Sequence, residues 1–180
     1  MNVLIVYGTT EGQTRKIAER AGKRVRDHGH EVELYDSASL APVLDVGAFH
    51  AIIVAASVHQ ERHQETISNF VIARRGQLSS KPTAFISVSL SAVLEHAKDE
   101  AQSYVDRFLA TTHWQPQKIL LLGGALRATE YDYFQQQILK FIVLKRGEAL
   151  DMERDYEFTD WNILAGFIYE FLAAAELRLR

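Results

Sequence analysis

The sequence predicts an α/β protein built on a doubly wound, five-stranded parallel sheet with strand order 2-1-3-4-5. Three observations predict this fold class. Short runs of aliphatic residues, of the kind buried on both faces of a parallel sheet, recur along the chain. Segments with apolar residues three or four positions apart, typical of helices, separate these runs. Strands that alternate with helices form such sheets through right-handed crossovers, and ligands bind at the carboxyl ends of strands 1 and 3.

The first strand and helix open the chain. Residues 3–6 are all aliphatic, and Gly8 ends the predicted strand. From residue 17 to residue 25 the apolar positions follow helical spacing, and Gly29 is suited to end this helix. Residues 31–35 alternate between polar and apolar side chains, which predicts the second strand. A loop with room for a short helix follows, over residues 36–47.

The remaining predicted elements repeat this alternation. Residues 49–55, 82–90 and 118–124 are the third, fourth and fifth strands. The helix between the third and fourth strands is expected to end at residues 74–76, and the last helix is expected to be capped at residues 159–161. The inward-facing helix residues are predicted to be Ile67, Phe70, Val71, Leu94, Ala97, Ala101, Tyr104, Val105, Phe108, Leu164, Phe167, Ile168, Phe171 and Leu172.

One segment exceeds what this plan needs. Residues 125–157 separate the fifth strand from the last helix, where a few residues would suffice. Within the segment, residues 131–146 have a helical pattern and residues 138–144 are apolar nearly all round. Such a surface needs a cover, and the pattern is compatible with a bound cofactor, a membrane or a second subunit. We therefore expect residues 1–180 to form a single domain with an insertion at about 125–157.

Composition narrows the possible functions. The chain has no Cys, which excludes disulfides, thiolate metal sites and cysteine nucleophiles. Its 20 basic and 23 acidic residues give a net charge of −3, which offers no attraction toward nucleic acid. His59 and His63 are four residues apart, but no further ligand is evident, so no metal is expected. The first apolar run is too short to span a bilayer, and no basic leader precedes it, so we expect a cytoplasmic protein.

The loop after the first strand carries the strongest functional signal. It reads Gly8-Thr9-Thr10-Glu11-Gly12-Gln13-Thr14 and leads into a helix, whose first amides are unpaired and attract phosphate. The dinucleotide pattern and the lysine-containing nucleoside-triphosphate pattern are both absent. An acidic side chain does not face a phosphate, so we expect Glu11 to point away or to cap the helix. An ordinary strand-turn-helix connection with a good N-cap is the alternative.

Phosphate binding by hydroxyls and amides, without Lys or Arg, resembles the flavodoxin family, whose first loop holds the phosphate of flavin mononucleotide (FMN). Thr9, Gly12 and Thr14 match the family pattern, whereas Glu11 stands where a hydroxyl is usual. The resemblance makes Thr9, Thr10, Glu11, Gly12, Gln13 and Thr14 the candidate phosphate-binding residues.

Two further loops are expected at the same edge of the sheet, because they also follow strands. The second carries Ala56, Ser57, Val58 and His59, and is suited to the ribityl chain and one edge of the flavin ring. The third carries Ser87, Val88, Ser89 and Leu90, whose backbone would face the pyrimidine edge, although each serine alone also suits an ordinary turn. Neither set contains Trp or Tyr, which leaves a ring face open to a substrate. His59 is the candidate proton donor.

The resemblance extends along nearly the whole chain. The segments that carry it are GTTEGQT, ASVH with the nearby His63, SVSL, the W-x-P at Trp114 and Pro116, GGALR at residues 123–127 and TDW at residues 159–161. Together they resemble the menaquinone-dependent protoporphyrinogen IX dehydrogenase family, a branch of the flavodoxin-like proteins. An acidic residue in the third position of the phosphate loop, here Glu11, is also what that branch shows.

This resemblance implies a flavodoxin-like fold and an FMN enzyme that oxidises protoporphyrinogen IX and reduces a membrane quinone. It implies that Arg127 pairs with a substrate propionate, as a guanidinium suits a carboxylate. It also implies a peripheral membrane contact through residues 134–146, for which a cover on the sheet or a homo-oligomer contact is the alternative. An electron carrier without a substrate of its own and a small NAD(P)H:quinone reductase are the alternative functions. The acidic residues Glu95, Asp99 and Glu100 after the fourth strand are poor neighbours for a dianionic porphyrinogen.

Overall fold

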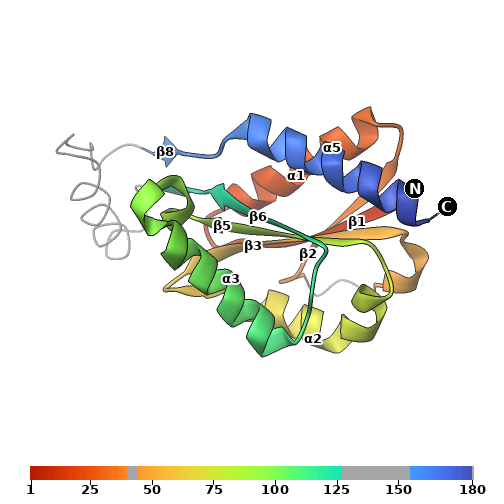
Figure 1. Cartoon of the computed structure of the whole chain (residues 1–180), viewed down its shortest axis with the longest axis horizontal. Helices are drawn as coiled ribbons and strands as arrows, with labels where there is room; N and C mark the ends of the chain where they lie inside the picture. Colours follow the sequence, from red (N-terminus) through yellow and green to blue (C-terminus); the bar gives the residue numbers. More distant parts are fainter. Residues whose placement is uncertain (40–43, 127–154, 180) are drawn as a thin grey trace.

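The computed structural model describes residues 1–39, 44–126 and 155–179. A parallel sheet lies between two layers of helices, with α1 and α5 on one face and α2 and α3 on the other (Figure 1). The strand order is β2-β1-β3-β5-β6, with a short strand, β4, paired only to β3. The predicted fold class, five parallel strands in the order 2-1-3-4-5, is therefore confirmed.

The strands follow the predicted runs closely. Their bounds are β1 Asn2–Gly8, β2 Glu31–Asp36, β3 Ala51–His59, β4 Arg62–His63, β5 Thr83–Ser89 and β6 Lys118–Gly123, with β7 Ala125–Leu126 and β8 Tyr156–Glu157 as a separate antiparallel pair. The central strands β1, β3 and β5 are buried along nearly their whole lengths. Their aliphatic sequences suit this position, because both faces of the sheet are covered by helices.

Among the described residues, four long helices cover the sheet with their apolar sides. They are α1 Gln13–Asp27, α2 Glu65–Ser79, α3 Lys98–Thr112 and α5 Trp161–Arg178, and three short 3-10 helices lie at Val46–Ala48, Ser91–Val93 and Glu95–Ala97. On the α1 and α5 side, Ile17 and Ile168 pack with the β1 residues Val3 and Ile5, all fully buried. Asp160 caps α5 as predicted, because its Oδ1 accepts from the amides of residues 162 and 163 at 2.9 and 3.0 Å.

Three local predictions differ from the structure. Helix α2 continues past Gly76 to Ser79, because Leu78 supplies another fully buried contact. Leu94 and Ala97 are buried as predicted, but they precede α3 in 3-10 turns, since Leu94 adopts an extended conformation (φ −98, ψ 119) that interrupts the helix. Phe167 is only partly buried. The helical pattern predicted for residues 131–146 lies outside the described residues.

Within the described residues, no helix has both the length and the hydropathy that a bilayer span requires.

Candidate cofactor site

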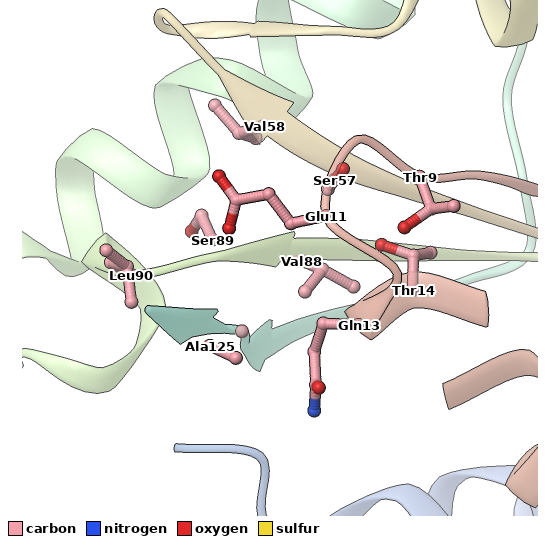
Figure 2. Close-up of a pocket in the computed structure, with 11 residues that line it drawn as sticks. Thr9, Glu11, Gln13, Thr14, Ser57, Val58, Val88, Ser89, Leu90 and Ala125 are labelled. Carbon is pink, nitrogen blue, oxygen red and sulfur yellow. The ribbon is translucent and has the colours of Figure 1, made fainter. Parts of the chain in front are cut away.

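A pocket opens at the carboxyl ends of β1, β3 and β5, where the sequence predicts the cofactor (Figure 2). Its lining residues come from three predicted loops and from the end of β6. They are Thr9, Glu11, Gln13, Thr14, Ser57, Val58, Val88, Ser89, Leu90, Gly124 and Ala125. The structure thus brings together residues that lie more than 100 positions apart in the chain.

The first loop turns directly into the amino end of α1. Gly12 is the N-cap residue with φ +86, and its amide donates to the Thr9 hydroxyl at 2.9 Å. No side chain caps the first turn of this helix. The Thr14 hydroxyl is buried, and it has no hydrogen-bond partner among the residues that the structure describes. An unpaired hydroxyl beside a helix amino end that no side chain caps is what a phosphate ligand satisfies.

The side chains of Thr10 and Gln13, in the same loop, form hydrogen bonds with groups outside the pocket. Thr10 does not line the pocket, and its hydroxyl accepts a hydrogen bond from the Gln64 side chain at 3.2 Å. The Gln13 side chain extends toward the start of α5 (Figure 2) and donates to the Thr159 hydroxyl at 2.8 Å. Thr159 in turn donates to the Gly123 carbonyl at 2.7 Å. Gln13 therefore ties the phosphate loop to the end of β6.

Glu11 lies across the pocket. Its side chain extends from the first loop toward Val58 and Ser89 (Figure 2), and all three residues line the cavity. The carboxylate thus points away from Thr14, as the sequence predicts, but it does not cap α1, whose N-cap is Gly12. The cavity volume is about 50 Å³. Because small-molecule sites usually measure about 300–1,000 Å³, this volume suits a phosphate-sized group and is too small for a whole nucleotide.

The second loop is a β-hairpin, which the sequence did not predict. Strand β3 continues to His59 and pairs with β4 through Val58 with His63 and His59 with Arg62. The turn between them, Gln60 and Glu61, has φ of 48 and 63 degrees. Left-handed conformations at two consecutive residues form the tight turn that suits a two-residue hairpin.

Not every predicted residue of this hairpin reaches the pocket. Ser57 and Val58 line it, whereas Ala56 is fully buried within β3 and His59 lies one residue beyond the lining.

The third loop contributes Val88, Ser89 and Leu90 to the lining, but not Ser87. The Ser87 side chain is 1% exposed, and its hydroxyl is hydrogen-bonded to His63 Nε2 at 2.9 Å. His63 is itself buried, and this burial lowers its pKa to about 4. His63 is therefore neutral near pH 7 and serves as an uncharged hydrogen-bonding group.

Behind the third loop, polar groups are paired with one another. The Ser91 hydroxyl donates to Glu100 Oε2 at 2.9 Å. Burial raises the pKa of Tyr104 to about 12, with a further contribution from its contact with Glu100. Ser89 accepts from the amide of Ala92 at 3.2 Å, which fixes the start of the loop.

Gly124 and Ala125 line the pocket although sequence reasoning did not select them. The signal was present, because GGALR directly follows the fifth strand and the carboxyl ends of parallel strands share one edge of the sheet. The backbone approaches closely here: a Cβ on Gly123 would lie 2.5 Å from the Phe158 carbonyl oxygen. Arg127, the predicted substrate-binding residue, lies outside the described residues.

Across residues 1–39, 44–126 and 155–179, no group of His, Asp and Glu side chains is arranged to hold a metal ion.

Comparison with known proteins agrees with this architecture. The chain belongs to the flavodoxin-domain family, whose profile matches residues 4–152. It is 27% identical to a protoporphyrinogen IX dehydrogenase [quinone] of Escherichia coli over 172 residues, which cover 94% of each chain. It is 26% identical to the protein of the same name from Leishmania major over 94% of this chain and 74% of that one.

A solved structure supports the fold alone. A short-chain flavodoxin associated with a PDU bacterial microcompartment has a TM-score of 0.59 at 14% identity. The similarity covers 97% of this chain and 99% of that chain.

The backbone conformation of Gly12 predicts a sensitive position. Replacing Gly12 with Ala or Val is expected to weaken FMN binding about tenfold, since a left-handed conformation costs an L-residue about 1–2 kcal/mol. A Cβ here meets no protein atom within 4 Å, so the effect comes from the backbone conformation, and the β-branched Val is expected to weaken FMN binding more than Ala. Gly29→Ala is the matched control, because Gly29 has φ +78 in equally open space at the far end of α1. Titration with FMN measures the change in affinity, and thermal unfolding measures the change in stability. Unchanged FMN affinity in both Gly12 variants would show that this position is not part of the FMN site.

Glu11 predicts the opposite effect. Glu11→Gln removes a negative charge from the pocket where the FMN phosphate is expected, so the FMN dissociation constant is expected to fall about threefold. The gain in FMN affinity is expected to shrink as salt is raised from about 10 to about 500 mM, because dissolved ions screen the repulsion between the carboxylate and the phosphate. Fluorescence titration at both ionic strengths measures it. Weaker binding of FMN by Glu11→Gln would show that the carboxylate itself contacts the ligand.

Proposed function

We propose that this chain binds FMN and catalyses the quinone-dependent oxidation of protoporphyrinogen IX to protoporphyrin IX. The observation that carries the FMN proposal is the Thr14 hydroxyl, buried without a partner in the described structure beside the uncapped amino end of α1. Membership of the flavodoxin-domain family supports the same cofactor. The relatives named protoporphyrinogen IX dehydrogenase support the substrate, because the similarity to the Escherichia coli protein covers 94% of each chain.

Each loop then has a part in binding. The hydroxyls of Thr9 and Thr14 and the first amides of α1 bind the phosphate, without a cation. FMN, when bound, supplies the atom that accepts a hydride equivalent from the porphyrinogen. Val58 and Leu90 flank the open part of the pocket, and their modest size leaves a flat substrate access to the ring. Backbone amides near Ser89 stabilise negative charge at the pyrimidine edge.

The substrate brings two carboxylates, so the charges near the third loop matter. Of the acidic residues there, Glu95 accepts from Lys98 Nζ at 2.8 Å, and Glu100 is held by Ser91. The ion pair of Glu95 with Lys98 offsets one of the negative charges that the sequence predicts near the substrate. We propose that Arg127 pairs with a substrate propionate. We also propose that His59, next to Val58 on the hairpin, is the proton donor.

The electron acceptor is proposed to be a membrane quinone. This requires the protein to reach the membrane surface, so we propose a peripheral contact on its inner face through residues 134–146. That segment and a subunit contact involving it lie outside the described residues.

One experiment tests the proposed function directly. Anaerobic FMN-loaded protein is mixed with protoporphyrinogen IX and a soluble menaquinone analogue, and porphyrin fluorescence is followed. Porphyrin is expected to appear well above the protein-free blank, and only when the quinone is present. Protein without FMN is the control. Porphyrin forming at the rate of the blank would reject the dehydrogenase proposal while leaving FMN binding intact.

Redox titration separates this proposal from an electron carrier. A two-electron enzyme is expected to be reduced in one wave. Two well-separated one-electron potentials would favour the carrier, which the absence of covering Trp or Tyr residues in the second and third loops argues against.

A further inference from the structure

The pocket is assembled from three separate loops, so its shape depends on how those loops are held relative to one another. Two consecutive residues outside the lining, His63 and Gln64, contact elements of all three. They follow the hairpin turn and lead into α2, whose N-cap is Gln64. We refer to His63 and Gln64 together as the brace.

Gln64 joins the first loop to the second. Its side-chain amide Nε2 donates to the Thr10 hydroxyl at 3.2 Å and also to the Ser57 hydroxyl at close range. Thr10 adjoins Thr9 in the phosphate loop, and Ser57 lines the pocket on β3. One amide group therefore sets the separation between the phosphate end of the pocket and the hairpin.

His63 joins the hairpin to the third loop. Its backbone pairs with Val58, and its Nε2 is hydrogen-bonded to Ser87, the residue before Val88 in β5. The imidazole packs against the stacked rings of Phe85 and Phe108, with ring centroids 5.2 and 5.0 Å away. His63 is 8% exposed, and these two aromatic contacts restrict its movement.

The hairpin turn itself needs this support. Gln60 and Glu61 both hold left-handed conformations, which are unfavourable for residues with a Cβ. Arg107 Nη1 donates to the Glu61 carbonyl oxygen at 3.0 Å and holds the turn from the side of α3. The turn is thus fixed on one side by Arg107 and on the other by the brace.

We propose that His63 and Gln64 are positioning residues for the cofactor: they hold the phosphate loop, the hairpin and the third loop at the separation that FMN requires. The proposal rests on the proposed function only in taking FMN as the ligand. Neither residue lines the pocket, so each acts through Thr10, Ser57 or Ser87.

Gln64→Met tests the first half, since Met has similar length and makes no comparable hydrogen bond. The FMN dissociation constant is expected to rise about tenfold, as two hydrogen bonds are lost. The inhibition constant of inorganic phosphate, measured by competition with FMN, is expected to change less than about twofold, because phosphate needs only the first loop. Gln102→Met is the matched control, since Gln102 bonds Asp106 on the surface of α3.

His63→Leu and Ser87→Ala test the second half. Each substitution is expected to raise the FMN dissociation constant about fivefold. The double variant is expected to bind FMN no more weakly than His63→Leu alone, because both substitutions remove the same hydrogen bond. His63→Gln, which keeps a hydrogen-bonding group, is expected to recover part of the affinity. Additive losses in the double variant would overturn the role of this hydrogen bond.

The outcomes separate this proposal from the proposed function. Wild-type protein that binds FMN, with Gln64→Met binding it equally well, overturns the brace alone. Equal losses of FMN and phosphate affinity also overturn it, because they indicate general destabilisation. Wild-type protein that takes up no FMN overturns both.

Discussion

Replacing Thr14 with Val is expected to stabilise the FMN-free protein and, at the same time, to weaken FMN binding about 30-fold. The two effects share one cause. The Thr14 hydroxyl is buried without a hydrogen-bond partner in the described structure, and an isosteric methyl group removes that unfavourable burial, worth about 1 kcal/mol. With the phosphate bound, the hydroxyl donates to a charged oxygen, and hydrogen bonds to charged groups contribute about 1.5–3 kcal/mol.

Chemical unfolding of the FMN-free protein and FMN titration measure the two effects. Thr112→Val is the matched control, because Thr112 is equally buried but donates to the Phe108 carbonyl at 2.9 Å in α3. That variant is expected to lose stability and to bind FMN normally. A Thr14→Val protein with unchanged FMN affinity would remove the central support for the phosphate site.

Acidification is expected to destabilise the FMN-free protein by about 3 kcal/mol through His63 alone. Burial holds the pKa of His63 at about 4, against 6.5 in the unfolded chain. Between these values the unfolded chain binds a proton that the folded protein does not, so stability falls as the pH falls from 6.5 to 4. Below about pH 4 both states are protonated, and this contribution has reached its limit.

Urea unfolding at intervals from pH 8 to pH 4 measures this slope. His63→Gln removes the titrating group and is expected to remove most of the dependence of the unfolding free energy on pH. A smaller slope remains, because the pKa of His30 is also lowered, chiefly by partial burial and then by the amino-terminal ammonium. A His63→Gln variant with the full wild-type slope would show that other groups control acid stability.

The parts of the fold predicted from sequence are those determined by local pattern. Aliphatic runs such as residues 3–6 identify buried strands, and their alternation with helices determines the sheet order. The end of α2 was predicted wrongly, because Gly76 is a weak stop signal when Leu78 has a buried position to fill. Tertiary contact outweighs local propensity there.

The position of the pocket follows from one rule: loops that follow parallel strands lie together at the carboxyl edge of the sheet. Ser57, Val88 and Thr14, which that rule selects, line the pocket, and their part in cofactor binding stays a prediction. The hairpin escaped prediction because its turn contains Gln60 and Glu61, not the Asn-Gly or Asp-Gly pairs that identify such turns.

The hydrogen bond between Ser87 and His63 was not predicted, for a different reason. Partners 24 residues apart on separate strands leave no periodic signal in the sequence. The Ser87 hydroxyl has an internal partner, and the predicted contact of the backbone in this loop with the cofactor stays a prediction.

The two-residue ladder formed by β7 and β8 has a consequence for the length of the chain between them. Ala125 pairs with Glu157 and Leu126 with Tyr156, so the chain leaves the core and returns to it at adjacent points. Lys16 and Trp161 both contact Glu157 and anchor that junction to the rest of the domain. Sequence between the two anchored ends can lengthen, shorten or be exchanged without altering the sheet. A change in the length of the chain between residues 126 and 156 is therefore compatible with the same sheet and the same pocket-lining strands.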